Sequence, residues 1–64
     1  MNKKEIGMRL RNARGKRTRA EVADAVEIGV STLGMYEWGH RIPRDDIKIK
    51  LANYYGIPVQ ELFY

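Results

Sequence analysis

Glycine and proline residues divide this chain into short stretches, and within each stretch the apolar residues recur at helical intervals. Gly15, Gly39 and Gly56 each follow one of these stretches, where a glycine can take the positive φ that ends a helix. No alternating apolar run and no hairpin dipeptide indicates a strand. The sequence therefore predicts an all-α fold of four to five short helices around one core.

Apolar spacing and capping residues predict where the helices lie. Thr18 and Glu21 match a capping box, in which the Thr18 hydroxyl accepts from the Glu21 amide and the Glu21 carboxylate accepts from the Thr18 amide. Ile28 is an aliphatic residue inside a short turn, which is typical of a plug between two crossing helices. The expected helices cover about residues 3–14, 19–26, 30–38, 45–55 and 58–63.

The composition excludes several classes of site. The 64 residues suffice for one domain, residues 1–64, and 44% of them are hydrophobic, as in a globular chain. With no cysteine and with His40 as the single histidine, we expect no disulfide, no thiol nucleophile and no metal centre. We also expect no cofactor, no small-molecule ligand and no enzymatic activity, because a chain this short can barely form a catalytic cleft.

No segment has the pattern of a signal peptide or of a membrane span, which needs about 18 consecutive apolar residues. We therefore expect a cytoplasmic, nucleoid-associated protein without membrane contact. The chain also has no room for an effector domain, so we expect regulation through its concentration, its dimerisation or a partner.

Basic residues are concentrated near the N-terminus. Residues 1–20 hold eight Lys and Arg against a single acidic residue, residues 21–64 hold four against seven, and the chain carries a net +4. A concentrated positive region is typical of proteins that bind an anionic partner, most often nucleic acid. A basic helix face that is merely solvated is the alternative.

Residues of about 19–38 combine a helix, a short turn and a second helix, which is a helix-turn-helix arrangement. The motifs within and around it are Ile6-Gly7-Met8-Arg9-Leu10-Arg11, Thr18-x-x-Glu21-Val22-Ala23, Val26-x-Ile28-x-x-Ser31-x-Leu33, Tyr36-Glu37-x-Gly39-x-Arg41-Ile42-Pro43, and the segment from Asp46 to Phe63. With these motifs the sequence resembles the Cro/cI-type (Xre, lambda-repressor-like) family of DNA-binding domains over nearly its whole length. The resemblance implies a lambda-repressor-like fold with double-stranded DNA as its partner.

The same resemblance implies which residues bind DNA. The third helix would enter the major groove with its first residues toward the bases. The base-facing positions are Val30, Ser31, Gly34 and Met35, and the phosphate-facing positions are Thr18, Arg19, Arg41 and Arg44. Arg14 and Glu37 match a partly buried ion pair between the first and third helices. For the three arginines at phosphate positions, an ordinary solvated side chain is the alternative.

Four residues depart from the family pattern. Glu27 stands where a turn glycine with positive φ is usual, at a cost of about 1 kcal/mol. Gly29 replaces a Ser or Thr helix cap, and Gly34 replaces a longer side chain that faces DNA. Trp38 replaces an asparagine beside phosphate, so its ring could face the loop, a DNA sugar or another protein.

The base-facing set contains no Arg, Lys, Asn or Gln, the side chains that form paired hydrogen bonds to a base. One interpretation is that Val30 and Met35 contact thymine methyl groups while DNA shape supplies further specificity. The other, motivated by Gly34 and Trp38, is a protein-interaction module of the same fold with weak DNA specificity, such as an antitoxin that masks a toxin. The complete phosphate-facing set favours the first interpretation.

Phe63 and Tyr64 are consecutive aromatic residues at the end of the last expected helix, and we expect that so small a domain cannot bury both. This region often forms a two-fold contact in the family. We therefore predict a homodimer, at least on DNA, that presents two recognition helices to half-sites one helical turn apart. Packing of Phe63 on the first helix is the alternative.

The expected function is that of a sequence-specific, double-stranded-DNA-binding transcriptional regulator whose recognition helix covers about residues 30–38. Repression is the expected mode because the occlusion of a promoter needs no further parts. A phage, prophage or other mobile element is the expected setting.

Overall fold

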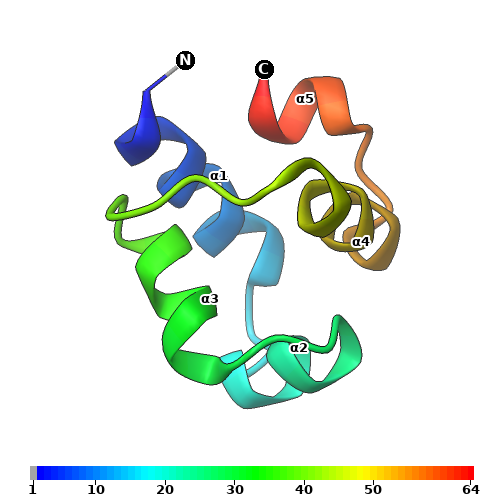
Figure 1. Cartoon of the computed structure of the whole chain (residues 1–64). Coiled ribbons are helices and arrows are strands. Elements are labelled where there is room, and N and C mark those ends of the chain that lie inside the picture. Colours follow the sequence, from blue (N-terminus) through cyan, green and yellow to red (C-terminus); the bar gives the residue numbers. More distant parts are fainter. Residues whose placement is uncertain (1) are drawn as a thin grey trace.

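The computed structural model of the chain describes residues 2–64, which form five helices and no strand (Figure 1). The helices are α1 (Lys3–Arg14), α2 (Arg19–Ala25), α3 (Val30–Glu37), α4 (Asp45–Tyr55) and α5 (Val59–Phe63). The expected all-α class is confirmed, and each helix begins and ends within one residue of the predicted position. None of the five helices is long and apolar enough to cross a membrane.

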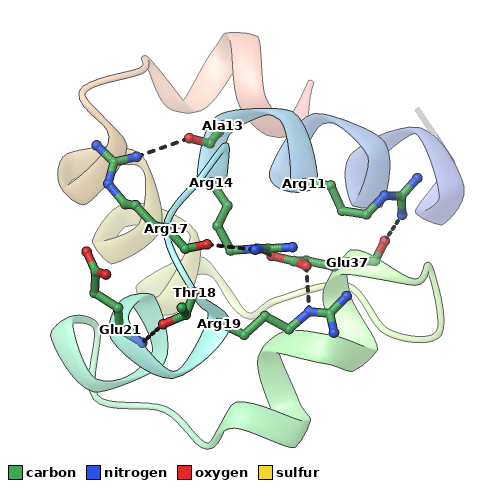
Figure 2. A network of polar contacts seen from close by, with 8 residues as sticks. All are labelled: Arg11, Ala13, Arg14, Arg17, Thr18, Arg19, Glu21 and Glu37. Atoms are coloured by element: carbon green, nitrogen blue, oxygen red, sulfur yellow. Dashed lines mark hydrogen bonds and ion pairs between the residues drawn. The ribbon is translucent and has the colours of Figure 1, made fainter.

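Local sequence signals account for the starts of the first two helices. The Asn2 side chain caps α1 by accepting from the Glu5 amide at 2.8 Å. The Thr18 hydroxyl caps α2 by accepting from the Glu21 amide at 3.0 Å (Figure 2). The predicted second bond of the capping box, from the Thr18 amide to the Glu21 carboxylate, does not form. The Glu21 carboxylate points away from Thr18 (Figure 2). One side chain therefore suffices to cap α2.

The turn between α2 and α3 contains the expected non-glycine residue in the left-handed conformation. Glu27 has a φ of 61°, which costs about 1 kcal/mol for a residue that carries a Cβ. The Ile28 amide donates to the Ala23 carbonyl at 2.9 Å, and the Ile28 side chain packs against the core. The strained residue and the apolar plug together turn the chain from α2 into α3.

All five helices contribute to one apolar core. Its buried side chains are Ile6, Leu10, Val22, Ala23, Val26, Leu33, Tyr36, Ile47, Leu51, Ala52, Leu62 and Phe63. α1 runs through the middle of the molecule, with α3 on one side and α5 on the other (Figure 1). This core fixes the helix-turn-helix pair α2–α3 against α1 and leaves the outer side of α3 in solvent.

Phe63 belongs to this core, with 1% of its surface exposed, and Leu62 beside it is equally buried. The structure therefore agrees with the alternative, in which Phe63 packs inside the domain, and only one of the two consecutive aromatic residues is buried. Two consecutive side chains fit because α5 packs against α1 and α4 at once and meets apolar surface on two sides. Phe63 is thus not available for a dimer contact, whereas Tyr64 is exposed, and its hydroxyl accepts from Lys48 Nζ at 2.9 Å.

Candidate nucleic-acid interface

α3 is anchored on one side and open on the other. Its inner side chains, Leu33, Tyr36 and Glu37, are buried. The residues on the outer side are Val30, Ser31, Gly34 and Met35, which helical spacing places on one face and of which all but the glycine are exposed. The structure therefore brings the four expected base-facing residues together on one accessible face.

Gly34 leaves a gap in this face. A Cβ built at Gly34 meets no atom within 4 Å, so packing inside the protein does not require a glycine there. A side chain at this position would stand between the helix and anything bound to it. Its absence lets a ligand approach the α3 backbone closely.

The Glu37 carboxylate is fully buried and joins three helices (Figure 2). Arg14 of α1 donates from Nε to Glu37 Oε2 at 2.8 Å, so the structure contains the expected ion pair. Arg19 of α2 donates from Nε to Glu37 Oε1, also at 2.8 Å, a contact that the sequence did not indicate. The hydrogen bond that Arg14 donates to Glu37 raises the pKa of Arg14 above its ordinary value, so Arg14 stays charged.

The Tyr55 hydroxyl adds no charge near this carboxylate. It is buried without a hydrogen-bond partner in the part of the chain that the structure describes. Burial raises the pKa of Tyr55 to about 12, and the negative charge of Glu37 adds to the shift. Tyr55 therefore stays protonated over the whole physiological range, and Glu37 provides the negative charge for the arginines around it.

α1 crosses α3 at Gly7, which is buried against the end of α3. A Cβ at Gly7 would overlap the carbonyl oxygen of Glu37 and lie 2.9 Å from its carbonyl carbon. The same carbonyl oxygen accepts a hydrogen bond from Arg11 Nη1 (Figure 2). Neither contact has a local sequence signal, because 26 residues separate Arg11 from Glu37.

The other expected phosphate-facing residues lie elsewhere around α3. Arg41 and Arg44 are exposed and line a depression of about 300 Å³ together with Gly29 and Thr32 at the N-terminal end of the helix. Arg44 is held only loosely, at 3.5 Å from Asp46. Thr18 is exposed as well, but its hydroxyl already caps α2, whereas Arg19 lies at the C-terminal end of α3.

The concentration of basic residues near the N-terminus does not form a uniformly free positive face. Arg9 donates to the Glu61 carbonyl at 2.6 Å, on the side of α1 that faces α5. Arg17 donates to the Ala13 carbonyl at 3.2 Å, and its guanidinium lies 5.4 Å from the centre of the Tyr54 ring. These partners are neutral and do not offset the charge of Arg9 or Arg17, and both side chains stabilise the fold through them.

Comparisons with known proteins agree with this geometry. Residues 8–62 match the sequence model of a family described as Helix-turn-helix. The "Cryptic phage CTXphi transcriptional repressor RstR" of Vibrio cholerae is 40% identical over 42 residues, which are 66% of this chain and 38% of that protein. The chain thus spans less than half the length of this relative. No solved structure gives a significant match.

Proposed function

The chain belongs to the Cro/cI-type helix-turn-helix family of DNA-binding domains, and on that premise we propose that it is a sequence-specific transcriptional repressor. The observation that carries the proposal is the exposed outer face of α3 with guanidinium groups at both of its ends. Arg41 and Arg44 lie near the N-terminal end, and Arg19 lies near the C-terminal end. An open helix face flanked by cations fits a major groove bordered by two phosphate backbones.

In this proposal α3 inserts into the major groove of double-stranded DNA and the arginines bind phosphates on either side of it. Repression follows from occupancy, since a protein bound across a promoter excludes polymerase. The relative from Vibrio cholerae is named as a transcriptional repressor, which supports the same mode. We further propose a homodimer on DNA, with Tyr64 as a contact, acting in the cytoplasm where the nucleoid lies.

Arg44 is the cleanest test of the phosphate contacts, because 78% of its side chain is exposed and it supports no buried group. We expect Arg44→Ala to weaken binding to all duplexes alike and to lower the slope of log K against log salt by roughly one unit. The measurement is a fluorescence titration with a selected and a mixed-sequence duplex at several salt concentrations. Arg19→Ala is a poorer test, because it also removes a partner of the buried Glu37 carboxylate.

Arg9→Ala is the matched control, since it removes the same charge from the side of α1 that faces α5. We expect it to leave the salt slope unchanged. If Arg44→Ala lowers the affinity only for duplexes that carry one particular base pair, and leaves the salt slope unchanged, the phosphate assignment is contradicted. If the unaltered chain shows no salt-dependent binding to any duplex, the proposed function itself is wrong.

Base recognition gives a second prediction, which concerns the methyl groups of thymine. Val30 and Met35 can contact a thymine C5-methyl but cannot hydrogen-bond to guanine, so duplexes selected from a random pool should be rich in A·T pairs. Replacing a contacted thymine by uracil should cost a few tenths to about 1 kcal/mol of binding free energy. Met35→Gln should shift the preference at that step toward adenine. Selected sites centred on guanine, or an unchanged affinity for every uracil duplex, would rule out this placement of α3.

A protein-interaction module is the second candidate function, and the exposed side chains of Trp38 and Met8 favour it. They line a depression of about 320 Å³ with Lys4 and Arg11, on the side of the molecule where α1 meets the end of α3. A module that only masks another protein has no need of salt-dependent duplex binding. The salt series described above therefore separates the two functions.

A further inference from the structure

Trp38 follows α3 directly, and two guanidinium groups lie over its ring. The Cζ atoms of Arg11 and Arg19 are 5.0 Å and 5.4 Å from the ring centroid. Arg11 comes from α1 and Arg19 from α2, so the indole gathers cations from two other helices. Cation–π contact of this geometry attracts a guanidinium without neutralising it.

Each of these guanidinium groups has a second anchor on Glu37. Arg11 donates from Nη1 to the Glu37 carbonyl oxygen, and Arg19 donates from Nε to the carboxylate at 2.8 Å (Figure 2). Both side chains are therefore held by a ring on one side and by an oxygen on the other. A guanidinium fixed in this way loses little further rotamer entropy when it binds a ligand.

The charges of this cluster do not balance. Arg11, Arg14 and Arg19 surround the single carboxylate of Glu37, while the partners of Arg11 are a neutral carbonyl and a neutral ring. In residues 2–64, one nitrogen of Arg11 and one of Arg19 donate to protein acceptors, which leaves further N–H donors on each. Both arginines are half-buried and Trp38 is 57% exposed, so the cluster is open to solvent.

We infer that Arg11 and Arg19 form a paired binding site for the DNA backbone phosphates beside the C-terminal end of α3, and that Trp38 is the residue that positions them. The inference rests on the proposed function and adds Arg11, which the sequence did not indicate, to the interface. A phosphate diester fits because its oxygens can accept from both planar guanidinium groups at once. Arg41 and Arg44 at the other end of α3 then bind the backbone on the opposite side of the groove.

Variants at Trp38 test the positioning role. Trp38→Ala should lower the affinity for a selected duplex and for a mixed-sequence duplex equally, by about three- to tenfold, and should flatten the salt slope. Trp38→Phe keeps a ring and should stay within about twofold of the unaltered chain. Met8→Ala is the matched control, because Met8 lines the same depression and is 52% exposed but has no charge with which to bind a phosphate. It should bind as the unaltered chain does.

A double-mutant cycle distinguishes positioning from a general effect on the fold. Arg11→Ala is used because Arg11 binds a carbonyl, so its removal leaves the buried carboxylate with both of its ion pairs. Arg11→Ala should reduce duplex affinity severalfold in the unaltered chain and clearly less when Trp38 is already alanine. Denaturant unfolding of every variant shows that each is folded at the binding temperature, and the salt slope reports phosphate contacts that a loss of stability alone does not move.

Any one of four results would overturn the inference. The first is an equal loss for Arg11→Ala with and without Trp38, and the second is a loss for Met8→Ala as large as that for Trp38→Ala. The third is that polyglutamate competes for the chain as strongly as duplex DNA does, and that Trp38→Ala weakens both competitors equally. That result would assign the cluster to an acidic protein. If the unaltered chain binds duplexes in a salt-dependent way, and Trp38→Ala leaves both the affinity and the salt slope unchanged, this inference alone fails and the proposed function stands.

Discussion

Replacement of Gly7 by alanine should destabilise the domain by more than about 3 kcal/mol, the upper end of the usual cost of overpacking. The added Cβ would overlap the Glu37 carbonyl oxygen and lie 3.0 Å from the Tyr36 carbonyl oxygen. Both obstacles are backbone atoms, which cannot rotate aside as a side chain can. α1 would have to separate from α3, and the core between the two helices would open with it. Because a domain this small has only about 3–10 kcal/mol of stability, much of the variant should be unfolded.

Urea unfolding followed by circular dichroism measures this effect, and Gly34→Ala is its control. Gly34 also lies inside a helix, but a Cβ there meets no atom within 4 Å. The same substitution should therefore stabilise the domain at that site by about 0.5–1 kcal/mol, the difference in helix propensity. A Gly7→Ala variant that unfolds within 1 kcal/mol of the unaltered chain would show that α1 and α3 do not approach this closely.

Glu37→Ala should cost about 3 kcal/mol of the free energy of unfolding. The substitution removes the partner of two half-buried arginines, Arg14 and Arg19, and leaves a space at the junction of three helices. The two guanidinium groups can turn partly toward water, which keeps the expected loss at the lower end for a buried ion pair. The same variant should also bind duplex DNA more weakly at temperatures where it is folded, because Arg19 loses its anchor.

Asp46→Ala is the matched control for the loss of a carboxylate. Asp46 pairs with Arg44 at 3.5 Å, and the two side chains are 64% and 78% exposed. Its removal should cost less than about 1 kcal/mol, including the favourable position of Asp46 at the start of α4. An equal loss for Glu37→Ala and Asp46→Ala in chemical denaturation would show that Glu37 does not hold the helices together.

Local chemistry explains why the sequence predicts the helices well. Thr18 can cap the helix that follows it whatever its surroundings, and Gly56 can end α4 because it reaches a φ of 68° without strain. Glu27 was expected at positive φ only because of the family resemblance, since nothing in its own chemistry favours that conformation. The family resemblance implied which four residues of α3 face DNA, and helical periodicity then places those four on one face.

The remaining features depend on residues far apart in the sequence. Gly7 looks like any glycine within a helix until α3 is placed across it. Arg19 has the pattern of an exposed first-turn residue, yet it bonds to Glu37, 18 residues later. Burial of Phe63 depends on the angle at which α5 meets α1 and α4. Periodicity within one helix cannot reveal such contacts, because they are set by how helices pack against one another.

The buried position of Phe63 also determines when during synthesis the domain can form. Its side chain completes a core that includes Ile6 and Leu10 of α1, and the start of α1 lies on the same side of the molecule as the end of α5 (Figure 1). A ribosome that still encloses residue 63 therefore holds back the part that closes the core. α2 and α3 are translated long before that point, but they gain their fixed arrangement only when the last helix emerges. The domain thus acquires its ability to bind in one step, once α5 has left the ribosome.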